Sequence, residues 1–140
     1  QTKKTFNFSS THLSIGETHR LQVLYLLSKP DLDSISNITI DSLMYFLNKN
    51  THLTIEIGVH LDRVNPKSST NLSQARAKRI ADQLIAKGIN PARLTAKGYG
   101  DTQPLVSKKT IELAQTKEEM EALHFKNRRT EIKITSTTFN

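Results

Sequence analysis

The chain has 140 residues, no cysteine and a net charge of +7, with 20 Lys and Arg residues against 13 Asp and Glu residues. This length predicts a single domain, in which roughly two-thirds of the unfolded chain's surface can be buried. The absence of cysteine excludes disulfides, thiolate metal sites and cysteine nucleophiles. The basic balance favours an anionic partner or serves only solubility. Lys and Arg are scattered in runs of at most two residues and aromatic residues make up 6%, which argues against nucleic acid as the partner.

Targeting signals are absent from the sequence as given. No apolar run approaches the roughly 20 residues of a membrane-spanning helix, and no charged-then-apolar signal segment opens the chain. A lipoprotein anchor would require a cysteine. We therefore expect the sequence to be the mature or excised soluble part of something larger. The hydrophobic fraction of 36% fits a small α/β domain with one solvated sheet face.

The first half of the chain predicts three strands and one helix. Alternating apolar residues predict short strands over Lys4–Phe8 and His19–Leu27. Apolar residues with helical spacing follow between Ile40 and Leu47. The strongest strand signal covers Leu53–Leu61, where five apolar residues alternate without a break, so this strand is predicted to be central. The opposite face of that strand then carries Glu56, Gly58, His60 and Asp62.

The next predicted helix follows a loop over Arg63–Thr70. Asn71 with Gln74 three residues later is a variant capping box, in which the Asn side chain accepts from a helix-start amide. Gly88 is placed to end this helix in a left-handed conformation.

The last third of the chain predicts two strands around one helix. A short strand over Arg93–Lys97 is followed by a turn over Gly98–Asp101. A second capping box at Thr116 predicts a helix through about Lys126, and alternation over Thr130–Ile134 predicts the final strand. The predicted order is β-β-α-β-α-β-α-β within one domain, residues 1–140.

Three blocks of sequence, in this order and spacing, resemble a known family. They are Ile55–Asp62, Leu72–Ala77 and Asn127–Ile132, with Gly88–Gly100 and Gln103-Pro104 between the last two. Over roughly residues 53–134 the chain resembles the OmpA-like peptidoglycan-binding domain of outer membrane protein A, peptidoglycan-associated lipoprotein and flagellar stator proteins. The resemblance implies an α/β (α+β) fold with a single βαβαβ mixed sheet and helices on one face. Residues 1–27 would add N-terminal strand structure, and residues 105–126 would be an inserted surface segment before the last strand.

The resemblance also implies a ligand site formed by Asp62, Arg76 and Arg128. The family ligand is the diaminopimelate of the peptidoglycan stem peptide, whose side-chain end carries an ammonium and a carboxylate on one carbon. Asp62 can accept from the ammonium, and Arg76 can bind the carboxylate through two parallel hydrogen bonds. We expect these two side chains to approach each other across a shallow groove. Arg128 either joins the ligand or belongs to a basic helix end that complements the helix dipole.

The chain departs from the family pattern around this site. Val59 and Leu61 stand where the family usually has Gly and Thr, and the loop has Asn65 in the region of the family's usual glycine. These departures bear on affinity more than on fold.

The resemblance therefore implies a non-catalytic module that anchors an outer-membrane or cell-envelope protein to peptidoglycan in the periplasm of a Gram-negative bacterium. No cofactor is expected. One alternative is an OmpA-like domain with a decayed ligand site that acts as a structural or protein-interaction module. Another is a basic nucleic-acid-binding domain. A metal site at Glu56, His60 and Asp62 is disfavoured because ligands at this spacing are common by chance, and the chain has no Gly-rich phosphate loop or nucleophile motif.

Overall fold

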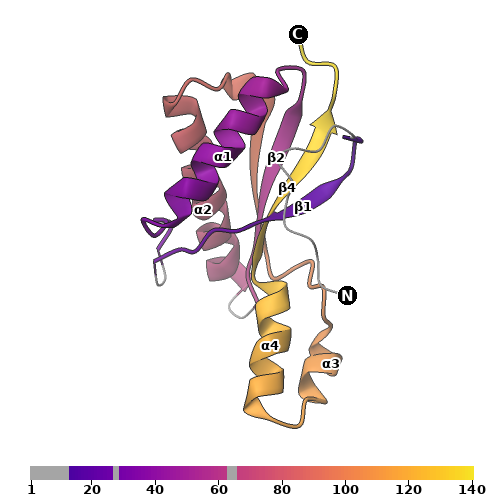
Figure 1. Ribbon diagram of the computed structural model, residues 1–140. Coiled ribbons are helices and arrows are strands. Elements are labelled where there is room, and N and C mark those ends of the chain that lie inside the picture. The colour runs from indigo at the N-terminus through magenta and orange to yellow at the C-terminus, as the bar shows by residue number, and fades with distance from the viewer. Residues whose placement is uncertain (1–12, 27–28, 63–65) are drawn as a thin grey trace.

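The computed structural model describes residues 13–26, 29–62 and 66–140, with only the backbone described for 66–69. A four-stranded sheet with strand order β1-β4-β2-β3 carries helices α1 and α2 on one face, while α3 and α4 project beyond one end of the sheet (Figure 1). β2 pairs parallel with β3 and antiparallel with β4, and β4 pairs antiparallel with β1. The predicted mixed sheet with a central Leu53–Leu61 strand is confirmed.

The elements have the following bounds. They are β1 Thr18–Leu21, α1 Ser36–Lys49, β2 Thr54–His60, α2 Pro66–Ala86, a 3-10 turn Pro91–Arg93, β3 Leu94–Gly100, α3 Lys108–Glu112, α4 Lys117–Asn127 and β4 Arg129–Ser136. In the described ranges, no helix combines the length and the apolar character that crossing a membrane requires.

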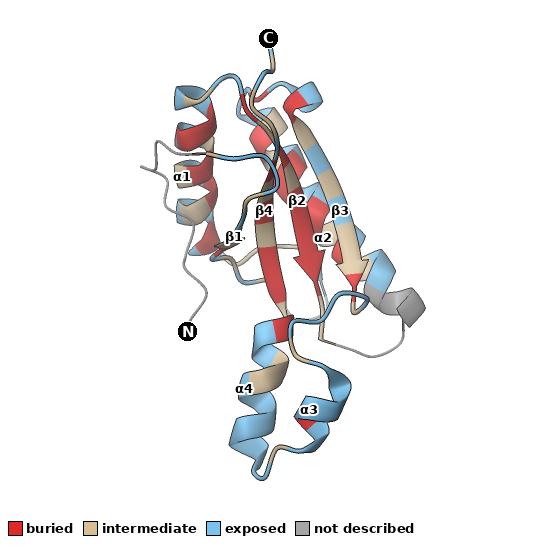
Figure 2. Ribbon diagram, turned by 90° about the vertical axis from the view of Figure 1, so that its right-hand side faces the viewer, coloured by how far each residue is buried: buried red, intermediate tan, exposed pale blue. Residues whose placement is uncertain are grey.

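The core lies between the sheet and the two helices that cover it (Figure 2). Side chains on the covered face of β2 and β4 are at most 1% exposed, as the alternating pattern predicted; they are Ile55, Ile57, Val59, Ile132 and Ile134. The helices contribute apolar stripes from α1 and α2, namely Ile40, Leu43, Phe46 and Leu47, and Ala77, Ile80 and Leu84. Gly88 follows α2 with φ +112°, which confirms the predicted left-handed helix end.

The predicted strand over His19–Leu27 is wrong in length, because β1 ends at Leu21. The chain then leaves the sheet, and Tyr25 forms only an isolated bridge with Leu32. The alternation continues past the strand end because Val23 and Tyr25 still pack against the core from a loop. The predicted strand over Lys4–Phe8 lies outside the described residues.

The predicted loop over Arg63–Thr70 is wrong from Pro66 onward, and so is the Asn71 cap, since α2 already begins at Pro66. Residues 63–65 of that loop lie outside the described residues. Proline suits the first helical turn because its φ is fixed and its missing N–H would have no partner there. Asn71 therefore lies within the helix, and Arg76 lies ten residues after its start. Arg76 is therefore further from the start of the helix than the predicted cap at Asn71 implied.

The predicted turn over Gly98–Asp101 is wrong because β3 runs through Gly100. A Cβ at Gly98 would lie 2.1 Å from the backbone N of Gln74, so glycine is what allows α2 to lie directly on β3. The Gln74 side chain, which was expected in a capping box, instead forms hydrogen bonds with the backbone of β3. Its Oε1 accepts from Gly98 N at 2.8 Å and its Nε2 donates to Ala96 O at 3.0 Å.

The segment over residues 105–126 forms α3, which the sequence did not predict, and α4, which it did. The Thr116 capping box is present, with Glu119 N donating to the Thr116 hydroxyl at 3.0 Å. Figure 2 shows the two helices below the sheet, mostly exposed. Ile111 is the one buried apolar residue of the two helices, and it is not part of the main core cluster.

Replacing residues 108–126 by a short Gly/Ser loop is expected to leave the domain folded. The junction would remain, because Asn127 Oδ1 accepts from Leu105 N and Val106 N at 2.8 Å each. We expect a loss of no more than about 1 kcal/mol, or about 4 °C in thermal midpoint, measured by circular dichroism. Complete loss of cooperative unfolding would show that the Thr116 helix belongs to the core.

Candidate functional site

Asp62 and Arg128 form an ion pair just beyond the end of β2. Arg128 Nη1 donates to Asp62 Oδ2 at 2.7 Å, across 66 positions of sequence. The Asp62 side chain is 15% exposed and that of Arg128 37%, so the pair is accessible from one side. The pair exists because β2 and β4 run antiparallel, which brings the second residue after β2 close to the residue before β4.

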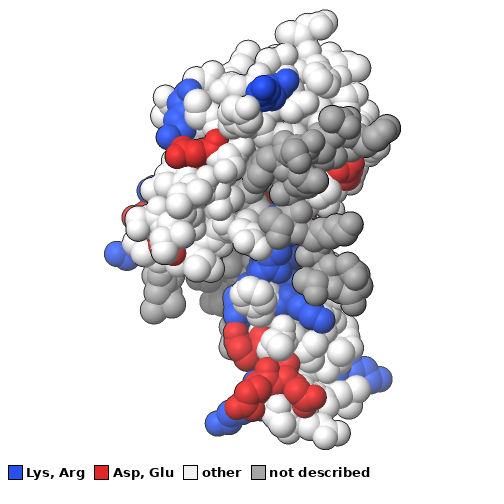
Figure 3. Space-filling view, in the orientation of Figure 1, with Lys and Arg blue, Asp and Glu red and all other residues white. Residues whose placement is uncertain are grey.

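Helix α4 supplies two more ionisable groups to this pair. Glu121 accepts a hydrogen bond from Arg128 Nη2. This bond, together with the one to Asp62, raises the pKa of Arg128 above its ordinary value. His124 Nδ1 lies 3.7 Å from Asp62 Oδ2, is buried, and has no hydrogen-bond partner within the described part of the chain. Figure 3 shows acidic side chains gathered on the projecting helices, with basic side chains where these helices meet the sheet.

Arg76 does not contact Asp62 directly in the structure. Its guanidinium carbon lies 4.4 Å from the centre of the Tyr25 ring. Its Nε donates to Lys29 O at 2.9 Å and its Nη2 to Leu26 O at 3.4 Å. Burial lowers the pKa of Arg76 from its ordinary value, but an arginine remains charged in any case.

Asp62 and Arg76 nevertheless belong to the same end of the sheet. The Tyr25 hydroxyl is hydrogen-bonded to Thr130 Oγ1 at 2.7 Å, and Thr130 pairs with Val59 on β2. Arg128 lies two residues before Thr130, and Asp62 three residues after Val59. The structure thus places Asp62 in contact with Arg128 beyond the ends of β2 and β4. Arg76 lies near the same strand ends, on the face of the sheet that α2 covers.

The polar face of β2 holds a network rather than a solvated surface. The Tyr99 ring crosses Gly58, stacks on the His60 ring at 4.6 Å between centroids, and its hydroxyl donates to Glu56 Oε1 at 2.6 Å. Burial, then the bond to Glu56, raises the pKa of Tyr99 to about 12. His60 Nε2 lies 3.8 Å from Glu131. The expected solvated face is therefore only partly present: over β2 these side chains pack on one another, while Thr95 and Lys97 on the same face of β3 are exposed.

The candidate metal ligands are each engaged by another side chain. Glu56 binds Tyr99, His60 stacks on that ring, and Asp62 pairs with Arg128. No group of three or more His, Asp or Glu residues in the described ranges could hold a metal ion.

The closing Asn127-Arg128-Arg129 block has three roles rather than one. The Asn127 amide holds the loop before α3 through Leu105 and Val106. Arg129 is buried, pairs with Glu131 at 2.9 Å, and donates to Gln103 O at 3.0 Å. Only Arg128 faces the candidate site, where it is also the C-cap of α4.

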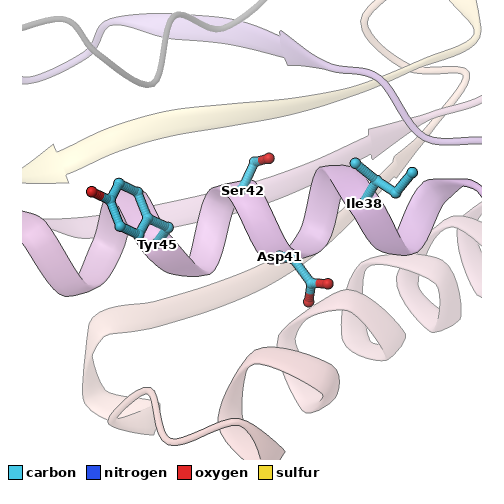
Figure 4. A pocket seen from close by; sticks show the side chains of 4 residues that line it. All are labelled: Ile38, Asp41, Ser42 and Tyr45. Carbon is cyan, nitrogen blue, oxygen red and sulfur yellow. The ribbon is translucent and has the colours of Figure 1, made fainter.

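A shallow hollow on the outer face of α1 is the alternative location for a ligand (Figure 4). It is lined by Ile38, Asp41, Ser42 and Tyr45, all from one helix. Asp41 points toward the α2 side and pairs with Lys87 at 3.0 Å. A surface with one charge, already paired, is less suited to a zwitterion than the end of the sheet.

Sequence reasoning missed three contributors to the site: Tyr25, Glu121 and His124. In the sequence, Tyr25 is only one apolar residue of a predicted strand, and Glu121 is one charge of an exposed helix. His124 belongs to no spacing motif. Their roles depend on contacts between distant segments, which no local pattern carries.

The mixed sheet and its two covering helices define an α/β domain with a charged pair at one end of the sheet. A family model described as the OmpA family matches residues 25–119, which is more than half of the chain. The chain therefore belongs to the OmpA family.

Two relatives are outer membrane proteins. Outer membrane porin F of Pseudomonas fluorescens is 32% identical over 72 residues, covering 51% of this chain and 22% of porin F. Outer membrane protein P5 of Haemophilus influenzae is 26% identical over 116 residues, covering 82% of this chain and 33% of P5. The chain thus spans between about a fifth and a third of the length of these relatives.

Several solved structures share the fold. The periplasmic domain of Helicobacter pylori MotB superimposes with a TM-score of 0.68 at 18% identity, covering 97% of this chain and 88% of that one. The peptidoglycan-associated lipoprotein from Burkholderia pseudomallei gives 0.61 at 18% identity, with 81% and 86% covered. The cell wall anchor of the T6SS from Pseudomonas aeruginosa gives 0.62 at 23% identity, with 85% and 79% covered.

Proposed function

We propose that this domain is a non-catalytic module that binds peptidoglycan without a covalent bond and anchors an outer-membrane or envelope protein to the cell wall. It would act in the periplasm, in association with the outer membrane. Membership of the OmpA family supports this proposal. So do the outer membrane relatives, and the names of structural neighbours, which include a peptidoglycan-associated lipoprotein and a cell wall anchor.

The observation that carries the proposal is the Asp62–Arg128 pair, partly exposed at the end of the sheet. Both contacts described for Asp62 use Oδ2. A carboxylate can accept from about four directions, so Arg128 leaves acceptor capacity for a ligand ammonium. The guanidiniums of Arg128 and Arg76 are the two candidates for the ligand carboxylate.

The ligand we propose is the side-chain end of diaminopimelate in the stem peptide. Its ammonium would donate to Asp62 and its carboxylate would accept from Arg76, with Arg128 beside Asp62. Charge-assisted hydrogen bonds contribute about 1.5–3 kcal/mol each. After the loss of translational and rotational freedom on association, two or three of them give weak, reversible binding. No cofactor takes part.

One observation favours the alternative, a decayed site that serves as a structural or protein-interaction module. Arg76 already donates to two backbone carbonyls, and Asp62 is already paired with Arg128. In that case these charges hold the loop and α4 on the sheet, and no ligand is needed.

Co-sedimentation with purified sacculi separates the two functions. We expect sedimentation with diaminopimelate-type sacculi at low salt, less at high salt because the pair is open to water, and less with lysine-type sacculi. Lysine has no distal carboxylate for Arg76 to bind. If the protein stays in the supernatant with diaminopimelate-type sacculi at low salt, the decayed-site function replaces the proposal.

A further inference from the structure

Arg76 is a partly buried cation whose described contacts are all with uncharged groups. They are the Lys29 and Leu26 carbonyls and the Tyr25 ring. None of the ion pairs among the described residues includes Arg76, and residues 1–12, 27–28 and 63–69 contain neither Asp nor Glu. No carboxylate of this chain is therefore identified as its counter-ion.

Most other described arginines are paired with a carboxylate or buried. Arg20 also contacts a carbonyl and an aromatic ring, but unlike Arg76 it lies close enough to Glu131, Arg128 and Arg129 for their charges to act on it. Arg128 faces Asp62 and Glu121, Arg129 faces Glu131, and Arg79 faces Asp31. Arg93 also bonds only carbonyls, but it bonds three of them and is buried. Arg76 differs from these because it combines partial exposure with an uncompensated charge, which is the property that an anion complements.

Tyr25 is what fixes this charge in place. Its hydroxyl is hydrogen-bonded to Thr130, which is buried in β4, so the ring is fastened to the sheet on one side and contacts Arg76 on the other. Burial raises the pKa of Tyr25 to about 12, so the phenol stays neutral at physiological pH. An aromatic face attracts a guanidinium without cancelling its charge.

We propose that Tyr25 is a positioning residue of the ligand site: its ring, with the two loop carbonyls, orients Arg76 and leaves its charge for a ligand carboxylate. The inference rests on the proposed function and adds to it the residue that prepares Arg76. A guanidinium held in advance loses less freedom on binding than a mobile one. Because the effect acts through the carboxylate, Tyr25 contributes to the discrimination of diaminopimelate from lysine.

The test uses two soluble muropeptides, identical except for meso-diaminopimelate or lysine at the third position, and isothermal titration calorimetry. Tyr25→Leu removes the aromatic face and is expected to weaken binding of the diaminopimelate probe by about 3- to 30-fold, from the usual strength of such contacts. Binding of the lysine probe should not change. Tyr25→Phe keeps the face and should bind both probes within about twofold of wild type.

Tyr45→Leu is the matched control, because Tyr45 also lies beside a cation, Lys49 at 5.3 Å, but on the outer face of α1. It should bind like wild type. If Tyr25→Leu does not fold by circular dichroism, Tyr25→Met replaces it in the comparison. Its unbranched side chain reaches further and adapts to irregular space, and it also lacks an aromatic face.

Each outcome decides the inference. If the leucine or methionine variant binds the diaminopimelate probe as wild type does, or loses both probes equally, Tyr25 does not position Arg76. If wild type binds neither muropeptide, the proposed function itself fails and the inference fails with it. A selective loss that phenylalanine rescues supports the inference.

Discussion

Replacing Asp62 or Arg76 by alanine is expected to abolish co-sedimentation with diaminopimelate-type sacculi while the fold remains intact. Each substitution leaves one charge of the zwitterion without a partner, and each loss of about 1.4 kcal/mol is a factor of ten in affinity. Neither side chain belongs to the hydrophobic core. The fraction of protein pelleted with sacculi measures the effect, and circular dichroism checks the fold.

The chain offers a control pair with the same residue types. Arg79 Nη1 lies 2.9 Å from Asp31 Oδ1, and both side chains are exposed, at 45% and 43%. Asp31→Ala and Arg79→Ala change the net charge in the same way, so they should still sediment with sacculi. If Asp62→Ala and Arg76→Ala also sediment like wild type, the charges at the end of the sheet are structural.

Gly98→Ala is expected to prevent the domain from folding, or to destabilise it by several kcal/mol. The new Cβ would lie 2.1 Å from Gln74 N and 2.6 Å from Gln74 Cα, so backbone rather than a flexible side chain must move. Since α2 packs closely on β3, relief requires separating a helix from the sheet. Chemical denaturation followed by circular dichroism measures the loss.

Gly16→Ala provides the comparison for that prediction. Gly16 has φ +89°, but no atom lies within 4 Å of the place that an alanine Cβ would take. Alanine there meets only backbone strain of about 1–2 kcal/mol. A Gly98→Ala protein as stable as the Gly16→Ala protein would show that α2 can move away from β3 at little cost.

The parts of the fold that the sequence predicted are those governed by local patterns. The alternation over Leu53–Leu61 predicted the central strand, because its apolar face is buried against both helices. The Thr116 capping box and the Gly88 helix end depend only on nearby backbone groups, and both are confirmed.

The wrong predictions arise where tertiary packing outweighs a local signal. Gly98 and Gly100 have turn composition, but they serve the approach of α2 to β3. Asn71 has a capping side chain, but the helix starts earlier, at Pro66. At the candidate site, sequence named Asp62, Arg76 and Arg128, yet could not show that Asp62 pairs with Arg128. That pairing depends on the register between β2 and β4.

The side chain of Gln74 has a consequence for how copies of this domain behave when crowded. Outer strands of a sheet present unpaired N–H and C=O groups that can recruit a strand from another molecule. On β3, the Gln74 amide occupies two such groups, at Ala96 and Gly98, so a helix residue takes the place of a fifth strand. The middle of this edge strand therefore has no free groups at these two positions, which opposes strand-to-strand pairing between neighbouring copies.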